Sequence, residues 1–327
     1  MTIVASEIKL YYPLTVSNDV TNGGRISSNP VGSGNIFPNA QNSERVSGST
    51  KYRKIFYKCE NADNTVLSTP QFFLMGDTPG LDRIVCFPGT QTDTQNTMVA
   101  TRLFGSGVTP ADIAAGSSTI TLVTESTDTL FAVNDPVIIT DKTTIDSDAG
   151  NLEFFTVGSV NVTGTTVSLV TSNAYTLSFA YAAGSKVTSI INLPDINATV
   201  ASVTNSSING TFASGYIGLD ATGGIEQMWT VSFTSSTAYT VVGDTLGLIG
   251  TGTKSTLFTA SNSAFSGHNY FTLPSTCWGG TFVTNDRVTF TTHPSAQAIW
   301  LKRVIPQNCS LSTDNTFSFA LIGNSDE

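Results

Sequence analysis

Short segments in which apolar and polar residues alternate recur along the whole chain, separated by turns rich in Gly, Asn, Asp and Pro. Residues 6–16, 51–60, 165–170 and 225–233 show the pattern clearly. A period of two is typical of strands with one buried face, and strands spaced by roughly ten residues are typical of antiparallel sandwiches and barrels. The pattern therefore predicts an all-β protein built from several small antiparallel β-sandwich or barrel modules.

The strand-like segments fall into groups along the chain. After a change in composition near residue 105, the segments predict a small acidic β-barrel module over residues 105–195, with one helical turn at residues 109–116. Residues 196–215 are rich in Ser, Thr, Asn and Gly and are expected to form a connector. A second small β module is expected over residues 210–292.

A polar stretch over residues 17–38 breaks the pattern near the amino terminus. Connections in compact domains are usually about 4–6 residues long, and much longer ones are often functional or disordered. We therefore expect an extended arm that becomes ordered against a neighbouring subunit. On this interpretation, removal of residues 1–35 impairs assembly more than folding of the monomer.

One short motif occurs twice. Residues 131–137 (Phe-Ala-Val-Asn-Asp-Pro-Val) and 282–288 (Phe-Val-Thr-Asn-Asp-Arg-Val) share Phe, Asn-Asp and Val at the same offsets, and residues 242–246 are a looser third copy. Asn tolerates a positive φ, and Asp can bond to nearby backbone, so the motif predicts a tight turn before a strand. It indicates either a turn that all-β chains commonly reuse or a duplicated small β module.

The chain has few charges, and they are unevenly distributed. Only 12% of its 327 residues are charged, and the net charge is −9. Residues 1–102 hold nine cations and eight acids, residues 103–290 hold four and thirteen, and residues 291–327 hold two and three. Because nucleic-acid binding needs clustered cations, the acidic middle argues against a nucleic-acid partner. It is typical of a solvated surface.

The residues that could carry catalysis are scattered. Four cysteines form no Cys-x-x-Cys pair and are expected to be reduced thiols in the core. His268 and His293 are not part of a hydrolase or metalloprotease motif, and the glycines follow the pattern of β turns instead of a phosphate loop. We therefore expect no enzyme activity and no cofactor.

Two weaker patterns in the sequence bear on ligand binding. Asp146, Asp148 and Glu153 surround a Gly-containing turn and are weak metal candidates, although the spacing fails that of an EF-hand and an acidic hairpin loop is the simpler interpretation. The Trp residues, at 229, 278 and 300, could stack on sugars, but each lies in an apolar run, which favours burial.

Six cations near the two chain ends are candidate assembly contacts. The segment 51–58 carries Lys51, Arg53, Lys54 and Lys58 on one predicted strand, where cations protect a sheet edge or face an acidic partner. Lys302 and Arg303 end a later apolar strand. The amino terminus lacks the pattern of a signal peptide, and no run approaches a membrane span, so we expect synthesis in a cytoplasm and no membrane partner.

Segments at both ends resemble structural proteins of tailed bacteriophages and prophages. The similarity lies in residues 35–37 (Asn-Ile-Phe) and 51–58 near the amino terminus. It also lies in residues 270–274, 278–281, 286–288, 290–294 and 300–303, which resemble the carboxyl-terminal part of tail- or baseplate-associated proteins. The resemblance implies that Trp300–Arg303 and residues 316–322 return to the amino-terminal sheet.

The resemblance thus implies a discontinuous β-sandwich assembly domain, residues 1–104 plus 293–327, that carries the two modules as insertions. It also implies a non-enzymatic virion protein, made in the bacterial host cytoplasm, that assembles into a homo-oligomeric ring or collar. Its partners would be the tail tube, sheath or baseplate proteins. A carbohydrate-binding receptor protein of the tail-fibre or spike type and a capsid decoration protein are the alternatives.

Overall fold

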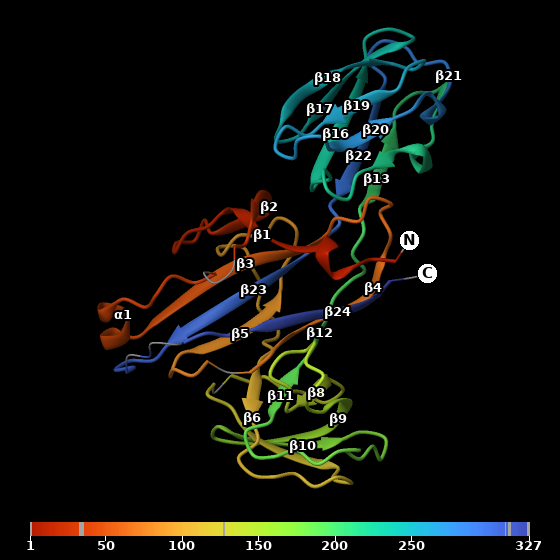
Figure 1. The fold of residues 1–327 in the computed structure, drawn as a ribbon. Coiled ribbons are helices and arrows are strands. Elements are labelled where there is room, and N and C mark those ends of the chain that lie inside the picture. The colour runs from red at the N-terminus through yellow and green to blue at the C-terminus, as the bar shows by residue number, and fades with distance from the viewer. Residues whose placement is uncertain are drawn as a thin grey trace.

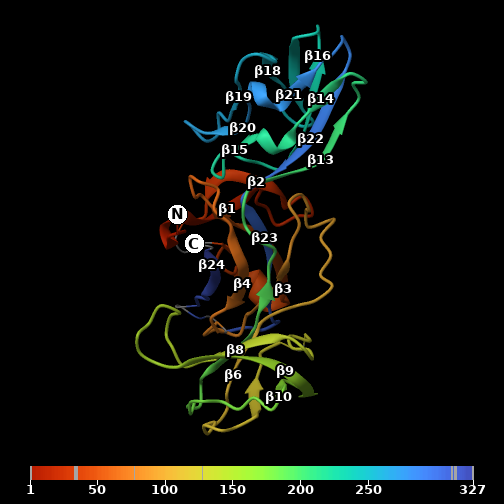
Figure 2. The same cartoon turned by 90° about the vertical axis from the view of Figure 1, so that its right-hand side faces the viewer.

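The computed structural model describes residues 2–32, 36–76, 78–126, 128–310, 312 and 315–325. The chain is all-β and is arranged as a central sandwich with one module at each of two opposite ends (Figure 1). The same order is seen in the perpendicular view (Figure 2). The predicted fold class is therefore confirmed, including the antiparallel sheets and the sheet shared by both ends of the chain.

The five-stranded sheet of the sandwich, here called sheet A, unites the two chain ends. Its central pair is β3 and β23, which are aligned from Lys58 opposite Ala296 to Ser49 opposite Ile305. The predicted return of Trp300–Arg303 to the amino-terminal sheet is thus confirmed. In spatial order the strands are β2 (Gly23–Pro30), β1 (Ile8–Thr15), β3 (Ser49–Cys59), β23 (Ala296–Ile305) and β5 (Arg83–Pro88).

A three-stranded sheet, sheet B, completes the sandwich. Its strands are β12 (Ile191–Asn192), β4 (Leu67–Leu74) and β24 (Phe319–Ser325). Residues 316–322 were expected to close the sheet that holds β3, but β24 pairs with β4 and lies in the opposing sheet. The core between the sheets contains the alternate side chains of β3, such as Ile55 and Tyr57, packed with Phe72 of β4.

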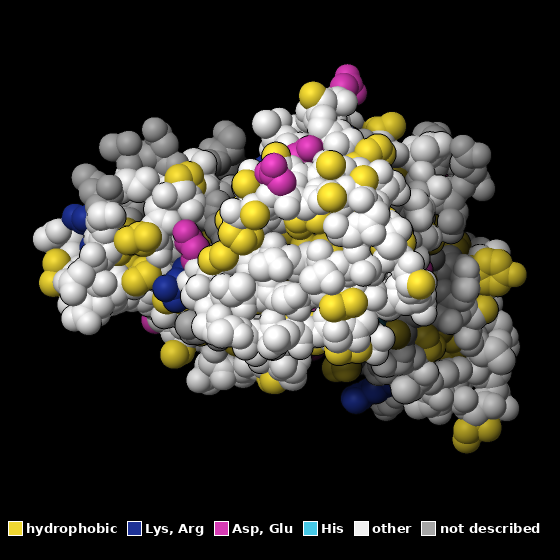
Figure 3. Space-filling view, turned by 90° about the horizontal axis from the view of Figure 1, so that it is seen from below, with side chains coloured by type: hydrophobic (Ala, Val, Ile, Leu, Met, Phe, Trp, Pro, Cys, Tyr) yellow, Lys and Arg dark blue, Asp and Glu magenta, His cyan; other side chains and the backbone are white. Residues whose placement is uncertain are grey.

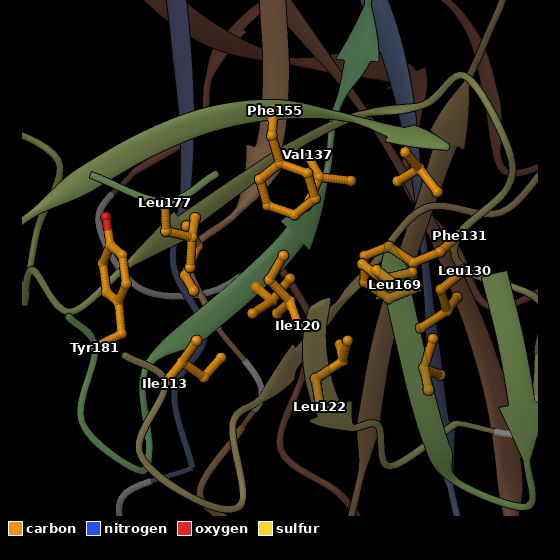
Figure 4. Packing of buried hydrophobic residues seen from close by; sticks show 14 of the residues in the cluster. Ile113, Ile120, Leu122, Leu130, Phe131, Val137, Phe155, Leu169, Leu177 and Tyr181 are labelled. Atoms are coloured by element: carbon orange, nitrogen blue, oxygen red, sulfur yellow. The ribbon is translucent and has the colours of Figure 1, made fainter. Parts of the chain in front are cut away.

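Residues 106–189 supply the strands of a closed six-stranded barrel. Alternate side chains fill its interior, where Ile120, Leu122, Phe155 and Leu169 point toward one another (Figure 4). The helical turn expected at residues 109–116 does not form, because Ile113 makes a bridge with Tyr181 instead. The strands are β6 (Ser106–Val108), β7 (Thr119–Val123), β8 (Pro136–Thr140), β9 (Leu152–Thr163), β10 (Thr166–Thr171) and β11 (Lys186–Ser189).

Residues 199–293 supply the strands of the upper module. An aromatic core, including Trp229, Phe271 and Phe290, lies between its sheets. The expected connector over residues 196–215 is wrong in part, since it contains two strands. The sheets are β13 (Thr199–Asn205), β22 (Arg287–His293), β16 (Gln227–Phe233), β17 (Ala238–Gly243) and β18 (Gly247–Thr253); β14 (Gly210–Phe212) and β21 (Trp278–Gly280); and β15 (Gly218–Leu219), β20 (Asn269–Leu273) and β19 (Phe258–Ser261).

The expected amino-terminal arm is corrected by the structure. Residues 23–30 form β2, which pairs with β1 of the same chain, so this part of the polar stretch completes a hairpin. Ile26 is buried, and the Ser27 hydroxyl donates to the Tyr12 carbonyl at 2.9 Å. The polar residues form a twisted edge strand whose pairing with β1 has two register shifts. These shifts interrupt the alternation, so a period-two pattern could not reveal the strand. Residues 33–35 lie outside the described part of the chain.

Helices are few and short in the described part of the chain. The α-helix α1 spans Asn42–Ser47, and three 3₁₀ helices are η1 (Ala5–Glu7), η2 (Ser214–Tyr216) and η3 (Ser275–Cys277). None of these described helices has the length and apolar character needed to cross a membrane.

Candidate functional site

The outer face of sheet A, turned away from sheet B, carries two of the predicted assembly candidates on β3, Lys54 and Lys58. On β3 the side chains of Lys54, Phe56 and Lys58 point to this face, because their neighbours Ile55 and Tyr57 point into the sandwich core. All three are fully buried. The outer face is therefore covered by other parts of the chain.

The loop over residues 89–101 covers one end of this face. Lys54 Nζ lies 2.7 Å from Asp93 Oδ1 and also donates to the Gly24 carbonyl at 2.7 Å. Trp300 Nε1 donates to the other oxygen of Asp93 at 2.8 Å. Burial lowers the pKa of Lys54, and Asp93 partly offsets this effect. A buried charge pair is tolerated when its hydrogen bonds are complete, as they are for Asp93.

Glycines allow this covering loop to approach the sheet closely. A Cβ on Gly89 would lie 2.9 Å from the Trp300 ring, and one on Gly23, whose φ is +112°, would lie 2.8 Å from the Asp93 carbonyl oxygen. Both substitutions would therefore push the loop or the hairpin off the indole. No sequence motif indicated this arrangement, because Asp93 lies in a stretch without strand periodicity.

The upper module covers the other end of the outer face, above Lys58. Lys58 Nζ donates to the Thr222 carbonyl, lies 3.9 Å from the ring centre of Phe265 and lies 3.8 Å from Glu60 Oε1. Burial lowers the pKa of Lys58 to about 8, although Glu60 and Asp220 favour its charged form. The lysine is therefore a charged group held between two parts of the chain.

The other four candidate cations are also satisfied within the chain. Their partners are Glu44 for Lys51 (2.6 Å), the Ser17 carbonyl and Asn18 for Arg53 (2.7 and 2.6 Å), Asp128 for Lys302 (3.2 Å), and Asp82 for Arg303 (2.6 Å). Moreover, β3 lies between β1 and β23 and is no edge strand. The interpretation that Lys51, Arg53, Lys54 and Lys58 protect an edge or face an acidic partner is therefore corrected: they stabilise the interior of this chain.

The metal candidates do not gather. Among the described residues, no three His, Cys, Asp or Glu side chains are grouped as a metal site would require. Asp146 and Asp148 are exposed, whereas Glu153 is buried in the barrel wall. Glu153 accepts hydrogen bonds from the Tyr175 and Tyr181 hydroxyls and from two backbone amides. Burial raises its pKa, but these four donors outweigh burial and the pKa is lowered.

The histidines and cysteines occupy structural positions. His268 Nδ1 lies 3.0 Å from Asp220, and His293 Nδ1 lies 2.6 Å from Glu226. All four cysteines are free, with Cys59, Cys86 and Cys277 buried and Cys309 half-buried. Burial raises the pKa of the Cys277 thiol to about 11, which makes it a poor nucleophile. For the three buried cysteines, the expected reduced core thiols are what the structure contains.

The repeated Phe-x-x-Asn-Asp motif forms the same turn twice. Asn134 and Asn285 have φ of +71° and +77°, and the Asp that follows each accepts a hydrogen bond from the amide three residues earlier. Phe131 and Phe282 are buried at the start of each turn. The turn at Asn134 leads into β8, whose partner β9 comes later in the chain. The turn at Asn285 leads into β22, whose partner β16 comes earlier in the chain. The repeat is thus a shared local turn on different topologies.

A cavity of about 600 Å³ lies at one end of the sandwich. Its lining includes Phe37, Phe317 and Phe319, and its charged pair, Arg303 and Asp82, is already joined by a hydrogen bond of 2.6 Å. No histidine is among the described residues that line it. The tryptophans offer no sugar platform either, since Trp229 and Trp300 are fully buried and Trp278 packs on Phe212.

Comparisons with known proteins do not assign the chain to a family. No protein-family model and no curated protein match the chain. A crystal structure of the infectious bursal disease virus VP2 subviral particle aligns with 95% of this chain and 82% of that chain, at 10% sequence identity and a TM-score of 0.10. A score this low carries no argument about fold or function.

Proposed function

We propose that the chain is a non-enzymatic structural protein of a tailed-bacteriophage virion. It forms part of the tail or baseplate, associates with further copies of itself into a ring or collar, and joins them to tube, sheath or baseplate proteins. The resemblance of the terminal segments to phage structural proteins supports this proposal, and the three-part architecture agrees with it.

One observation carries most weight. Both chain ends build one sandwich, and the two inserted modules project from it in opposite directions (Figures 1 and 2). A subunit of this shape can contact lateral neighbours through the sandwich while each module reaches a different level of an assembly. Binding and contact surfaces of this kind need no catalytic cleft.

The surface chemistry is compatible with packing against other proteins. Most cations named above are used inside the chain, and exposed side chains are largely polar and uncharged with scattered apolar ones. Seen from below, the molecule shows this mixture with few charged groups (Figure 3). Apolar residues such as Leu14, Val99 and Leu248 are each more than half exposed. Interfaces between proteins are depleted of charge at their centres.

Electron microscopy of the virion, combined with the oligomeric state of the purified chain, tests the proposal. The expected result is density for this three-part subunit in a symmetric ring on the tail or baseplate. A monomer absent from virions, or one that cleaves a polysaccharide, would refute it. Density on the capsid shell would instead support the decoration-protein alternative.

A further inference from the structure

The two inserted modules are attached to the sandwich in different ways. The barrel shares an apolar cluster with the outer face of sheet B, in which Phe73 and Met75 of the sandwich pack with Ile138 and Ile190. The upper module contributes only Phe265 to the apolar cluster on the outer face of sheet A, beside Tyr11 and Phe56. Among the described residues, the side-chain hydrogen bonds and ion pairs that join the upper module to the outer face of sheet A come from Lys58 and Arg25.

The two segments that connect the barrel to the sandwich are held by backbone hydrogen bonds along their length, so neither offers an unbonded residue that could act as a hinge. Phe104 exchanges both backbone hydrogen bonds with Cys86 at 2.8 Å, just before the barrel begins. On the return, Ile190 bonds to the Pro136 carbonyl, and β12 pairs with β4. Both links are thus built into ladders up to the barrel wall, which fixes the barrel on the sandwich.

The links of the upper module differ. Asn64 holds Ala198 by two hydrogen bonds, of 2.9 and 2.7 Å, and Cys59 N donates to the Ser295 carbonyl at 2.9 Å. Between these anchors and the module lie only the paired ends Thr199 and His293, with the bend at Pro294. The chain passes between the sandwich and the upper module twice, at Thr199 and at His293, and these two connections lie side by side. They form a hinge axis, because rotation about them disturbs few backbone hydrogen bonds.

Beyond the hinge, three contacts between described residues hold the upper module down. Phe265 packs edge-on against Tyr11 with 5.8 Å between ring centres, and Lys58 donates to the Thr222 carbonyl beneath it. On the far side, Arg25 of β2 pairs with Asp244 at 3.3 Å and bonds to Thr245. The Arg25–Asp244 pair is partly exposed and contributes little, since surface ion pairs are weak.

We propose that the upper module is a hinged arm, which rotates about the paired ends at Thr199 and His293 and is held on sheet A by a releasable contact of Lys58 with Thr222 and Phe265. The barrel, in contrast, stays fixed. Release would expose Lys58, Tyr11 and Phe56 on the outer face of sheet A, and it would change the direction in which the arm projects.

A distance measurement tests this. The half-buried Cys309 is first replaced by Ser, since the other three cysteines are buried. Fluorophores are then placed on cysteines introduced as Ser47→Cys in the sandwich and Ser236→Cys in the arm, both at exposed positions. Single-molecule energy transfer should show one narrow distance in this chain. Phe265→Ala should broaden or shift it, because the ring that covers Lys58 is lost.

Two controls accompany the Phe265→Ala variant. Tyr216→Ala removes an exposed ring from the same module and should leave the distance unchanged. A second label pair, Ser47→Cys with Thr163→Cys on the barrel hairpin, should be unaffected by Phe265→Ala. If Phe265→Ala leaves the distance between arm and sandwich narrow and unshifted, the links hold the arm and the proposal fails. Should that variant unfold the module, Lys58→Glu, which leaves the module's sequence intact, must release it.

The docking equilibrium should also depend on pH. The groups that face Lys58 are Glu60 just after β3, Lys9 and Tyr11 on β1, and Asp220 with its partner His268 on the arm. The pKa of Lys58 is about 8 when it is covered, below its ordinary value of 10.5. The released state therefore binds the proton more tightly, so docking is weakest below about pH 8 and strengthens as pH rises toward 10.5.

This dependence is measured in the Phe265→Ala variant, where both states are populated. Its docking constant should increase as the pH rises above about 8, because docking covers Lys58 and disfavours its charged form. In the double variant with Lys58→Met, the constant should be nearly independent of pH in this range. A docking constant that falls with pH, or an equal rise in the double variant, would show that docking does not bury Lys58 and would contradict the proposed contact.

Discussion

At the scale of single residues, Asp93 joins three parts of the chain. Its carboxylate accepts from Lys54 of β3 and Trp300 of β23, and its own position lies in the covering loop. The indole of Trp300 is stacked on Phe87 and closed over by Gly23 and Gly89. The side chain therefore packs on every side, which makes Trp300 the best single probe of the outer face of sheet A.

We predict that Trp300→Ala lowers the free energy of unfolding by about 3–5 kcal/mol, because it leaves a large cavity and removes one hydrogen bond to Asp93. Ile208→Ala is the control, since Ile208 is 95% exposed and its loss should change stability by less than about 0.5 kcal/mol. Both are measured by chemical denaturation. A loss under about 1 kcal/mol for Trp300→Ala would mean that the loop repacks over the gap.

The roles of the candidate cations show where sequence reasoning stops. The strand Ser49–Cys59 could be predicted, because alternation is a local signal. Whether Lys54 and Lys58 meet solvent is decided by Asp93 and Thr222, which lie 39 and 164 residues away in sequence. Neither partner lies in a motif. The burial of these cations is therefore a tertiary effect that periodicity cannot reveal.

At the scale of elements, the repeated Phe-x-x-Asn-Asp turn was visible as an echo in the sequence, and its local chemistry could be predicted from Asn and Asp. Its topological setting could not, since β8 is followed by its partner β9 and β22 is preceded by its partner β16. The same limit applies to β2, whose polar residues looked like an arm until pairing with β1 was known.

We predict that Asp286→Ala lowers the free energy of unfolding by about 1 kcal/mol, the usual loss for one hydrogen bond, here that from the Val283 amide. Asp135→Ala should cost more, because Asp135 also pairs with Arg102 and is partly buried. Burial raises the pKa of Asp135, while the Ala132 amide and Arg102 oppose that effect. Denaturation of the two variants gives the comparison, and equal losses would show that the Arg102 pair adds nothing.

At the scale of the whole molecule, the amino-terminal hairpin belongs to the sandwich. We predict that removal of residues 1–35 impairs folding itself, since it strips β1 and β2 from sheet A and uncovers Phe56. The measurement is the thermal unfolding of the purified variant beside the full chain. An unchanged melting temperature together with failed assembly would restore the interpretation of this segment as an arm.

The two modules should differ sharply when they are removed. Each module begins and ends at paired residues, Thr199 opposite His293 in the upper module and Ser106 opposite Thr188 in the barrel. A short Gly-Ser link can therefore close the gap that either deletion leaves. Removal of residues 199–293 uncovers Lys58, whose ammonium is well solvated in water, and Tyr11, whose hydroxyl donates to Glu60 at 2.5 Å. The sandwich should therefore keep its fold and stay monodisperse.

Removal of residues 106–189 uncovers instead the apolar cluster face formed by Phe73, Met75, Ala320 and Ile322. Burial of a large apolar side chain such as Phe73 or Met75 contributes about 1.5–3 kcal/mol to the free energy of unfolding. Exposure of this face should therefore lower the stability of the sandwich and promote aggregation. Size-exclusion chromatography and thermal unfolding of both deletions give the comparison. If the chain without the upper module aggregates while the chain without the barrel stays folded, the upper module is needed for stability and the barrel is dispensable.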